Sequence, residues 1–173
     1  MPPPAYWFDR PPVHDPRVDA CLRESYDQDD LARLRSLLTE LKVFDLAPMP
    51  SGLYPAVPEA RAVTGYGNAW VRDNIQVANV AWELGEMGWA QSNARAMLGW
   101  FAVQAPRFEA CIDGRADIAD KMQRPHIRFD GLRLRELDEG WPHKQNDALG
   151  YAPWFLARAV LAGLLPADDA TCA

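Results

Sequence analysis

The sequence predicts an all-α domain that carries one small β-hairpin. Apolar residues recur at helical spacing over residues 29–45, 71–88, 90–105 and 145–163. Over 127–134, apolar residues instead alternate with arginines, and Asp130-Gly131 stands between the two halves as the expected tight turn. The 173 residues suffice for one domain, or form a fragment of a larger protein.

Composition excludes several classes of function. The 18 basic and 24 acidic residues give a net charge of −6, which argues against a partner that is nucleic acid or an anionic membrane. No apolar run approaches the roughly 20 residues of a membrane span. Three cysteines lie far apart and predict neither a disulfide framework nor a metal site, and we expect no cofactor: Cys21, Cys111 and Cys172. Because the first residues lack a signal pattern, we expect a cytoplasmic protein.

Prolines and apolar spacing predict the domain organisation. Many of the 15 prolines crowd into residues 2–16 and 48–58, which predicts an extended arm over 1–28 and a helical domain over 29–173. The first helix starts at Asp29 or Asp30 and runs to about Asp45. Its predicted apolar face consists of Leu31, Leu34, Leu38 and Leu41.

Residues 71–88 are predicted to form a helix that is apolar nearly all round, which is typical of an inner helix covered on both sides. Residues 90–105 form the next helix, which turns Ala94, Met97, Leu98 and Phe101 inward and which Pro106 ends. A short helix is predicted at 115–122. The last helix, 145–163, contains Pro153 as a kink or a late start, and Gly163 ends it.

Two polar segments stand where inner helices begin. Trp70-Val71-Arg72-Asp73-Asn74 opens the first, and Gly140 to Asp147 precedes and opens the last. Taken alone, each has a structural explanation: Arg72 in a salt bridge, Asp73 as a helix cap, Trp141 as core filler, and Asp147 as a first-turn acid. His143 has the chemistry of a general base, although a lone loop histidine is more often a hydrogen-bonded residue.

Both segments converge if the two inner helices run parallel. Their N-termini then meet at one end of the domain, and an indole face beside charged and amide groups is an arrangement that binds sugars. The predicted substrate-binding residues are Trp70, Arg72, Asp73, Trp141, His143, Gln145 and Asp147.

These segments carry a resemblance to a known family. AWVRDN at 69–74 and WPHKQND at 141–147, with SGLYPAV at 51–57, resemble blocks of the glucoamylase-type glycoside hydrolases and of the related phosphorylase kinase α/β regulatory subunits. The resemblance covers about residues 51–163. It implies about two helix pairs of an (α/α)6 six-hairpin toroid, and a site for the terminal glucose of an α-glucan or oligosaccharide.

The resemblance leaves catalysis open. An inverting mechanism needs two carboxyl groups about 6.5–9.5 Å apart, and in the family both glutamates lie on later helices. Asp138 and Glu139 match neither position, and we expect them to be solvated loop charges, so no residue is assigned as catalytic. Hydrolysis would then need a missing C-terminal part. The alternative is a non-catalytic regulatory domain like the kinase subunits.

An incomplete ring would leave one flank of the last helix uncovered. Such a flank includes parts of Trp154, Phe155 and Val160, and favours self-association or a second chain that completes the ring. A third interpretation is a generic helical protein in which the motifs occur by coincidence.

Overall fold

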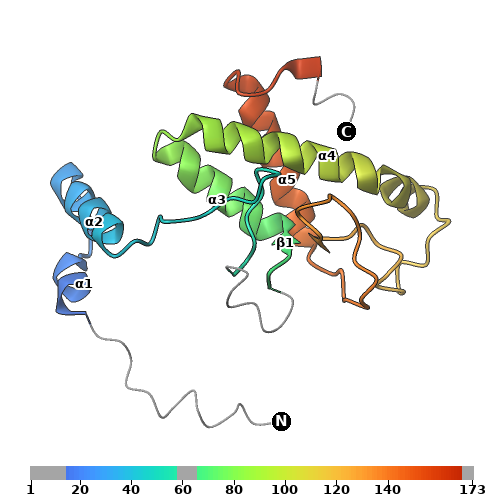
Figure 1. The fold of residues 1–173 in the computed structure, drawn as a ribbon, viewed down its shortest axis with the longest axis horizontal. Coiled ribbons are helices and arrows are strands. Elements are labelled where there is room, and N and C mark those ends of the chain that lie inside the picture. The colour runs from blue at the N-terminus through green and yellow to red at the C-terminus, as the bar shows by residue number, and fades with distance from the viewer. Residues whose placement is uncertain (1–14, 58–65, 169–173) are drawn as a thin grey trace, which may run out of the picture. The chain divides into compact units, whose positions relative to one another are not determined.

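The computed structural model of the chain describes residues 15–57 and 66–168 (Figure 1). The chain forms two compact units, one up to Leu46 and the other from Ala47 onward. The sequence placed its boundary earlier, after residue 28. Residues 1–14 of the predicted arm, and residues 58–65 of the predicted loop, lie outside the described ranges.

The first unit holds two helices, α1 (Pro16–Cys21) and α2 (Gln28–Glu40). The prediction of an extended segment is wrong at α1, because Asp15 caps the backbone N–H of Arg17 and Pro16 fits the first helical turn. In α2 the cap is Asp27, in a reciprocal capping box with Asp30, and not Asp29 or Asp30.

The buried face of α2 differs from the predicted apolar face. Leu37 is its buried residue, whereas Leu31 and Leu41 are exposed. The face within this small unit therefore centres on a leucine outside the predicted set.

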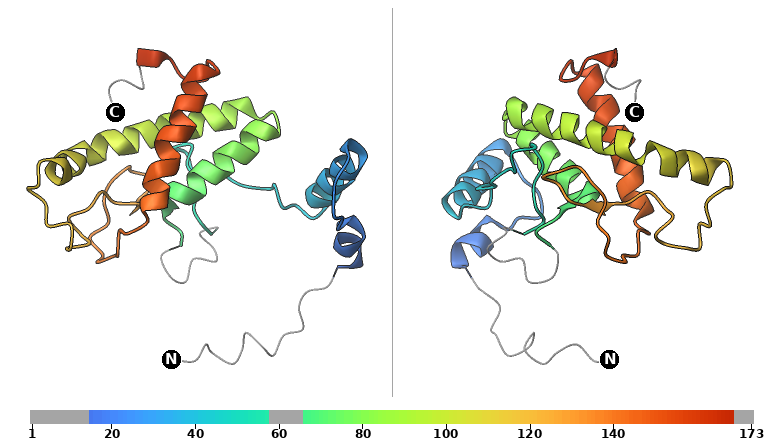
Figure 2. Two further views of the ribbon diagram at one scale, coloured as in Figure 1. Left: turned by 180° about the vertical axis from the view of Figure 1, so that it is seen from behind. Right: turned by 45° about the vertical axis from the view of Figure 1, so that its right-hand side comes forward.

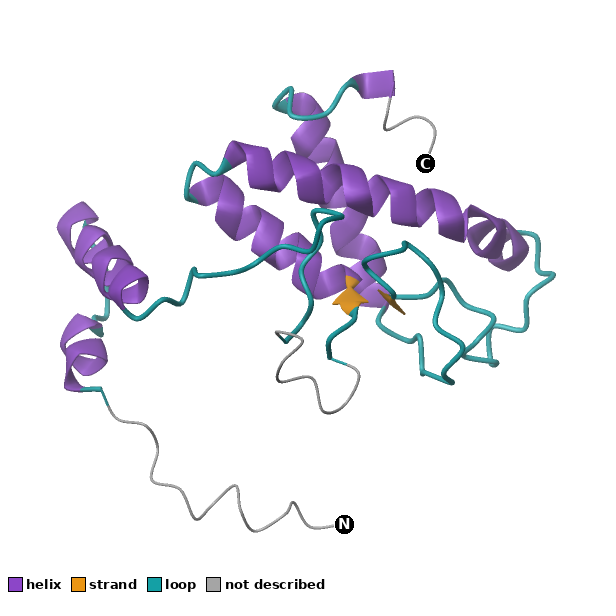
Figure 3. Ribbon diagram, in the orientation of Figure 1, coloured by secondary structure: helices purple, strands orange, loops and turns teal. Residues whose placement is uncertain are grey.

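The second unit confirms a mainly α-helical fold with one small antiparallel sheet (Figure 3). Its elements are β1 (Ala69–Trp70), α3 (Val71–Glu83), α4 (Met87–Ile112), β2 (Arg128–Phe129) and α5 (Asn146–Leu161). Helices α3, α4 and α5 pack on one another, and their core includes Ile75, Ala78, Met97, Trp100, Ala152 and Phe155. Among the described residues no helix has the length and apolar character needed to cross a membrane.

Helices α3 and α5 run in the same direction, as the sequence predicted. Arg72 near the start of α3 pairs with Asp147 near the start of α5. At the other ends, Glu83 pairs with Arg158. Both helices start beside the small sheet, as Figures 1 and 2 show.

Two predictions about the middle of the unit are wrong. Helix α4 continues through Pro106 to Ile112, and its last turns run in a different direction from the first (Figure 3). A proline removes one backbone hydrogen bond and bends a helix without having to end it. Residues 115–122 form turns instead of a short helix, because polar side chains such as that of Asp117 take the backbone N–H groups.

The predicted hairpin over 127–134 is reduced to a turn closed by an isolated antiparallel bridge between Asp130 and Arg135, and the strand before it, β2, pairs instead with β1 from far along the chain. Ala69 lies opposite Phe129, and Trp70 lies opposite Arg128. Phe129 also stacks on Trp100 of α4, with ring centroids 3.9 Å apart, which anchors β2 to the core.

Local hydrogen bonds explain why residues 131–134 turn instead of pairing. The carboxylate of Asp130 accepts from the backbone N–H groups of Leu132 and Arg133. Gly131 permits close packing, since a Cβ there would lie 2.7 Å from the Cβ of Ala69.

A buried asparagine joins α3 to the segment before it and to α4. The side-chain oxygen of Asn74 accepts from the backbone N of Tyr54 at 2.7 Å and from Nδ2 of Asn93 at 3.0 Å. Its Nδ2 donates to the carbonyl oxygens of Tyr54 and Trp70. Asn74 is fully buried, so these four bonds form away from water.

The loop between α4 and α5 is tied to α4 by side chains. Trp100 Nε1 donates to the carbonyl of His126 at 3.0 Å, and the backbone N of His126 donates to Gln104 at 2.6 Å. Arg107 binds both carboxylate oxygens of Glu136 and donates to the carbonyl of Met122. The pKa of Glu136 falls to about 2, chiefly because of its hydrogen bond with Arg107.

Candidate functional site

The candidate site lies where α3 and α5 begin beside the sheet. Arg72 and Asp147 meet there, with Nη1 and Oδ2 2.7 Å apart and both side chains partly exposed. The hydrogen bond from Arg72 lowers the pKa of Asp147. Asp73 lies next to Arg72 and is half-buried, and this burial raises the pKa of its carboxyl group.

Aromatic rings gather around Trp70, the residue of β1 that precedes α3. Trp70 and Trp141 touch edge to face, with ring centroids 5.2 Å apart, and Tyr66 stacks on Trp70 at 5.6 Å. The guanidinium carbon of Arg128 lies 4.8 Å from the ring centroid of Trp141. Trp70 and Trp141 are thus in contact with each other, and the guanidinium group that lies against Trp141 belongs to Arg128.

Two of the predicted site residues have other places. His143 is buried and stacks on His126, with ring centroids 3.8 Å apart, and its Nδ1 accepts from the backbone N of Ile127. Its side chain is thus part of the interior. Gln145 is the N-cap position of α5 and forms no side-chain cap, so the structure assigns it no contact with the ion pair.

Both histidines are held in the neutral form. Burial lowers the pKa of His126, and burial together with nearby positive charge lowers the pKa of His143 to about 4. The neutral imidazole of His143 can accept the hydrogen bond from the backbone N of Ile127 at its Nδ1. A charged imidazole carries a proton on both nitrogens and could not accept this bond.

Arg128 is a residue of this site that the sequence analysis did not assign. It alternates with the apolar residues Ile127 and Phe129, yet its side chain is 2% exposed and pairs with Glu139 at 2.8 Å. Glu139 is exposed at 69%, as a solvated charge would be, yet it is the carboxylate partner of a buried cation. A lone arginine between two apolar residues gave no signal of this burial.

The described residues contain no cluster of three or more histidine, cysteine or acidic side chains that could hold a metal ion. Cys21 and Cys111 are both free thiols and lie in different units.

Comparison with known proteins finds similarity to one bacterial protein that is named as a lipoprotein. The chain is 26% identical over 179 aligned residues to "Uncharacterized lipoprotein YgeQ" of Escherichia coli (strain K12). The alignment covers 91% of this chain and 66% of the relative, so the chain spans slightly less than two thirds of that protein's length. No family model matches the chain, and no solved structure matches it.

This comparison corrects the predicted function. A relative with the name of a lipoprotein overturns the glucoamylase-like carbohydrate function and its kinase-subunit alternative. The description of the chain as a glycoside hydrolase of carbohydrate metabolism is overturned with them. The predicted cytoplasmic location is wrong on the same ground. The two motifs were too short to carry a function. The predicted binding roles of the site residues, and the family resemblance itself, stay predictions.

Proposed function

We propose that this chain binds a hydrocarbon chain, such as that of a lipid, in an apolar groove between α4 and α5. The groove has a volume of about 400 Å³, within the range of small-molecule sites. The residues that line it are all apolar: Leu98, Phe101, Phe108, Leu149, Ala152, Pro153, Leu156 and Ala157. The apolar character of every side chain that lines the groove is the observation that carries the proposal.

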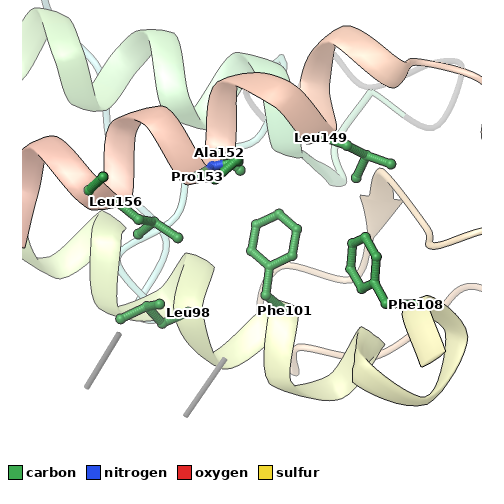
Figure 4. A pocket seen from close by; sticks show the side chains of 8 residues that line it. Leu98, Phe101, Phe108, Leu149, Ala152, Pro153 and Leu156 are labelled. Atoms are coloured by element: carbon green, nitrogen blue, oxygen red, sulfur yellow. The ribbon is translucent and has the colours of Figure 1, made fainter. Parts of the chain in front are cut away.

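The groove follows from the spacing of apolar residues on the two helices. On α5 the lining positions recur at intervals of three and four residues, so they share one face. Figure 4 shows the rings of Phe101 and Phe108 projecting from α4 toward α5, with Leu149 near Phe108 and Leu98 facing Leu156. A hydrocarbon chain gains about 0.8 kcal/mol for each methylene that such a surface buries.

The ligand class also agrees with the relative. Its name is that of a lipoprotein, and a lipid contributes hydrocarbon of the kind that this groove accepts. A sugar or a nucleotide would find no hydrogen-bonding side chain among the lining residues.

The matched pair Leu156→Gln and Leu161→Gln tests the proposal. Both residues are leucines of α5, but Leu156 lines the groove while Leu161 is 89% exposed. We expect Leu156→Gln to weaken binding about tenfold, because it replaces an apolar wall by an amide. We expect Leu161→Gln to leave the affinity unchanged.

Binding is measured by the fluorescence of N-phenyl-1-naphthylamine, a neutral apolar probe, and by its displacement with dodecanoate below the micelle concentration. Circular dichroism of both variants checks that they fold. An affinity that is the same in the wild type and in both variants would contradict the proposal.

Self-association remains a second proposal, carried by a different face of α5. Trp154 is 53% exposed and Leu161 is 89% exposed, although Phe155 is buried. We expect sedimentation velocity to show a concentration-dependent dimer that Trp154→Gln weakens. Identical monomeric profiles at all concentrations would refute this proposal.

A further inference from the structure

Trp70 and Arg128 form a buried pair across the small sheet. They are direct partners in the antiparallel register, so their side chains project from the same face. Both also contact Trp141, through the ring contact of Trp70 and the guanidinium group of Arg128. Their side chains are thus gathered around one partly exposed indole.

Each of these two buried residues carries a nitrogen donor without an acceptor. Trp70 is 5% exposed and Arg128 is 2% exposed, and within the described part of the chain neither Trp70 Nε1 nor Arg128 Nε has a hydrogen-bond partner. Two buried acceptors also lack partners, on Asn93 and His126. The two unpartnered donors, in contrast, lie in a single cluster. Unsatisfied buried donors are rare in native structures, and call for an explanation.

Glu139 satisfies Arg128 only in part. Its Oε2 accepts from Nη2 of Arg128 at 2.8 Å. Nε and Nη2 lie on one edge of a guanidinium group, and a carboxylate that spans this edge accepts from both nitrogens at once. The Glu139 side chain leaves Nε without a partner and is itself 69% exposed, so it can move into water and be replaced.

We propose that the cluster of Trp70, Arg128 and Trp141 binds an organic carboxylate. The ligand carboxylate accepts from Nε and Nη2 of Arg128 in place of Glu139, and the indole N–H of Trp70, the cross-strand partner of Arg128, supplies a further donor. Trp141 and the exposed ring of Tyr66 offer apolar faces for the body of the ligand. The proposal concerns residues outside the groove between α4 and α5, and does not depend on it.

The test uses benzoate as the probe and benzamide as its neutral isostere. Indole Nε1–H and arginine Nε–H groups both give signals in a ¹H–¹⁵N correlation spectrum, so the two unpartnered donors can be observed directly. Spectra of Trp70→Phe and Arg128→Lys assign the two signals. We expect benzoate to move both signals saturably, and benzamide to leave them in place.

Two matched substitutions complete the test. Glu139→Gln removes the competing carboxylate and is expected to tighten benzoate binding about two- to fivefold, because benzoate then no longer has to displace a charged acceptor from Nη2 of Arg128. Arg128→Lys keeps the charge but loses the planar edge, and is expected to weaken binding about tenfold or more. Arg133→Lys, at an exposed arginine, is the control and should not change the affinity.

The outcome of Glu139→Gln is decisive even if Arg128→Lys does not fold, because glutamine keeps the size of Glu139 and an oxygen that accepts from Nη2 of Arg128. Signals that do not move with benzoate, or that move equally with benzamide, would overturn the proposal. An affinity for benzoate that Glu139→Gln leaves unchanged would also overturn it.

Discussion

Replacing Asn74 by leucine is expected to lower the free energy of unfolding by about 3 kcal/mol or more. Leucine keeps the volume but removes the amide that makes four hydrogen bonds, two with Tyr54, one with Asn93 and one with Trp70. Each buried group left without a partner costs about 1–3 kcal/mol. The loss is large because four buried hydrogen bonds are lost at one position.

Urea denaturation followed by circular dichroism measures this loss. Gln76→Leu is the matched control, since Gln76 is an exposed residue of the same helix. It should change the stability by no more than about 0.5 kcal/mol. Equal stabilities of the two variants would mean that the hydrogen bonds of Asn74 add nothing to the fold.

Acidification is expected to destabilise the domain before its carboxylates titrate. The pKa of His143 falls from an ordinary 6.5 to about 4 in the folded chain, and that of His126 is also lowered. The unfolded chain therefore binds protons first as the pH drops below 6.5. The contribution of the neutral His143 to the free energy of unfolding is therefore fully present above pH 6.5. It is lost as the pH falls toward 4, and it amounts to on the order of 3 kcal/mol.

Other groups titrate in a different range. The pKa of Glu136 is about 2, so its contribution is lost as the pH falls from 4.5 toward that value. Burial raises the pKa of Asp73, so protonation of this carboxyl group favours the folded state. In the acidic range Asp73 therefore opposes the loss of stability that the histidines cause. The interval between about pH 7 and pH 4.5 thus reports mainly on the histidines.

Denaturation at several pH values across this interval tests the prediction. His143→Gln should flatten the dependence, because the substituted residue has no proton to gain. Lys144→Gln is the control, because Lys144 is the exposed neighbour of His143. A slope that is the same in both variants would show that the buried imidazole pair does not cause the effect.

Local sequence patterns predicted much of the helical framework. Helix α3 and helix α5 are apolar on several sides, and the prediction that they run parallel brought Arg72 and Asp147 together before any contact was known. Gly85 and Gly163 follow these helices with positive φ, as expected of residues that end a helix.

The parts that could not be predicted depend on contacts between distant segments. Nothing near Arg128 indicates that its strand pairs with Trp70, 58 positions earlier in the sequence. Likewise, a proline in a helical pattern usually marks the end of the helix, but α4 continues through Pro106 to Ile112. The short motifs brought Arg72 and Asp147 together but not His143, which is buried, and the comparison with a lipoprotein overturns the function inferred from them.

Hydrogen bonds from α4 side chains to the loop that follows should decide where this loop can gain or lose residues during evolution. Helix side chains, not neighbouring strands, supply many of the partners for its backbone: Trp100 and Gln104 hold His126, and Arg107 holds Met122. An inserted or deleted residue between Met122 and His126 would shift these partners out of register. At the exposed turn around Ile118, the same change would displace fewer such ties. Length variation should therefore accumulate near residue 118, while the spacing between Met122 and His126 stays constant.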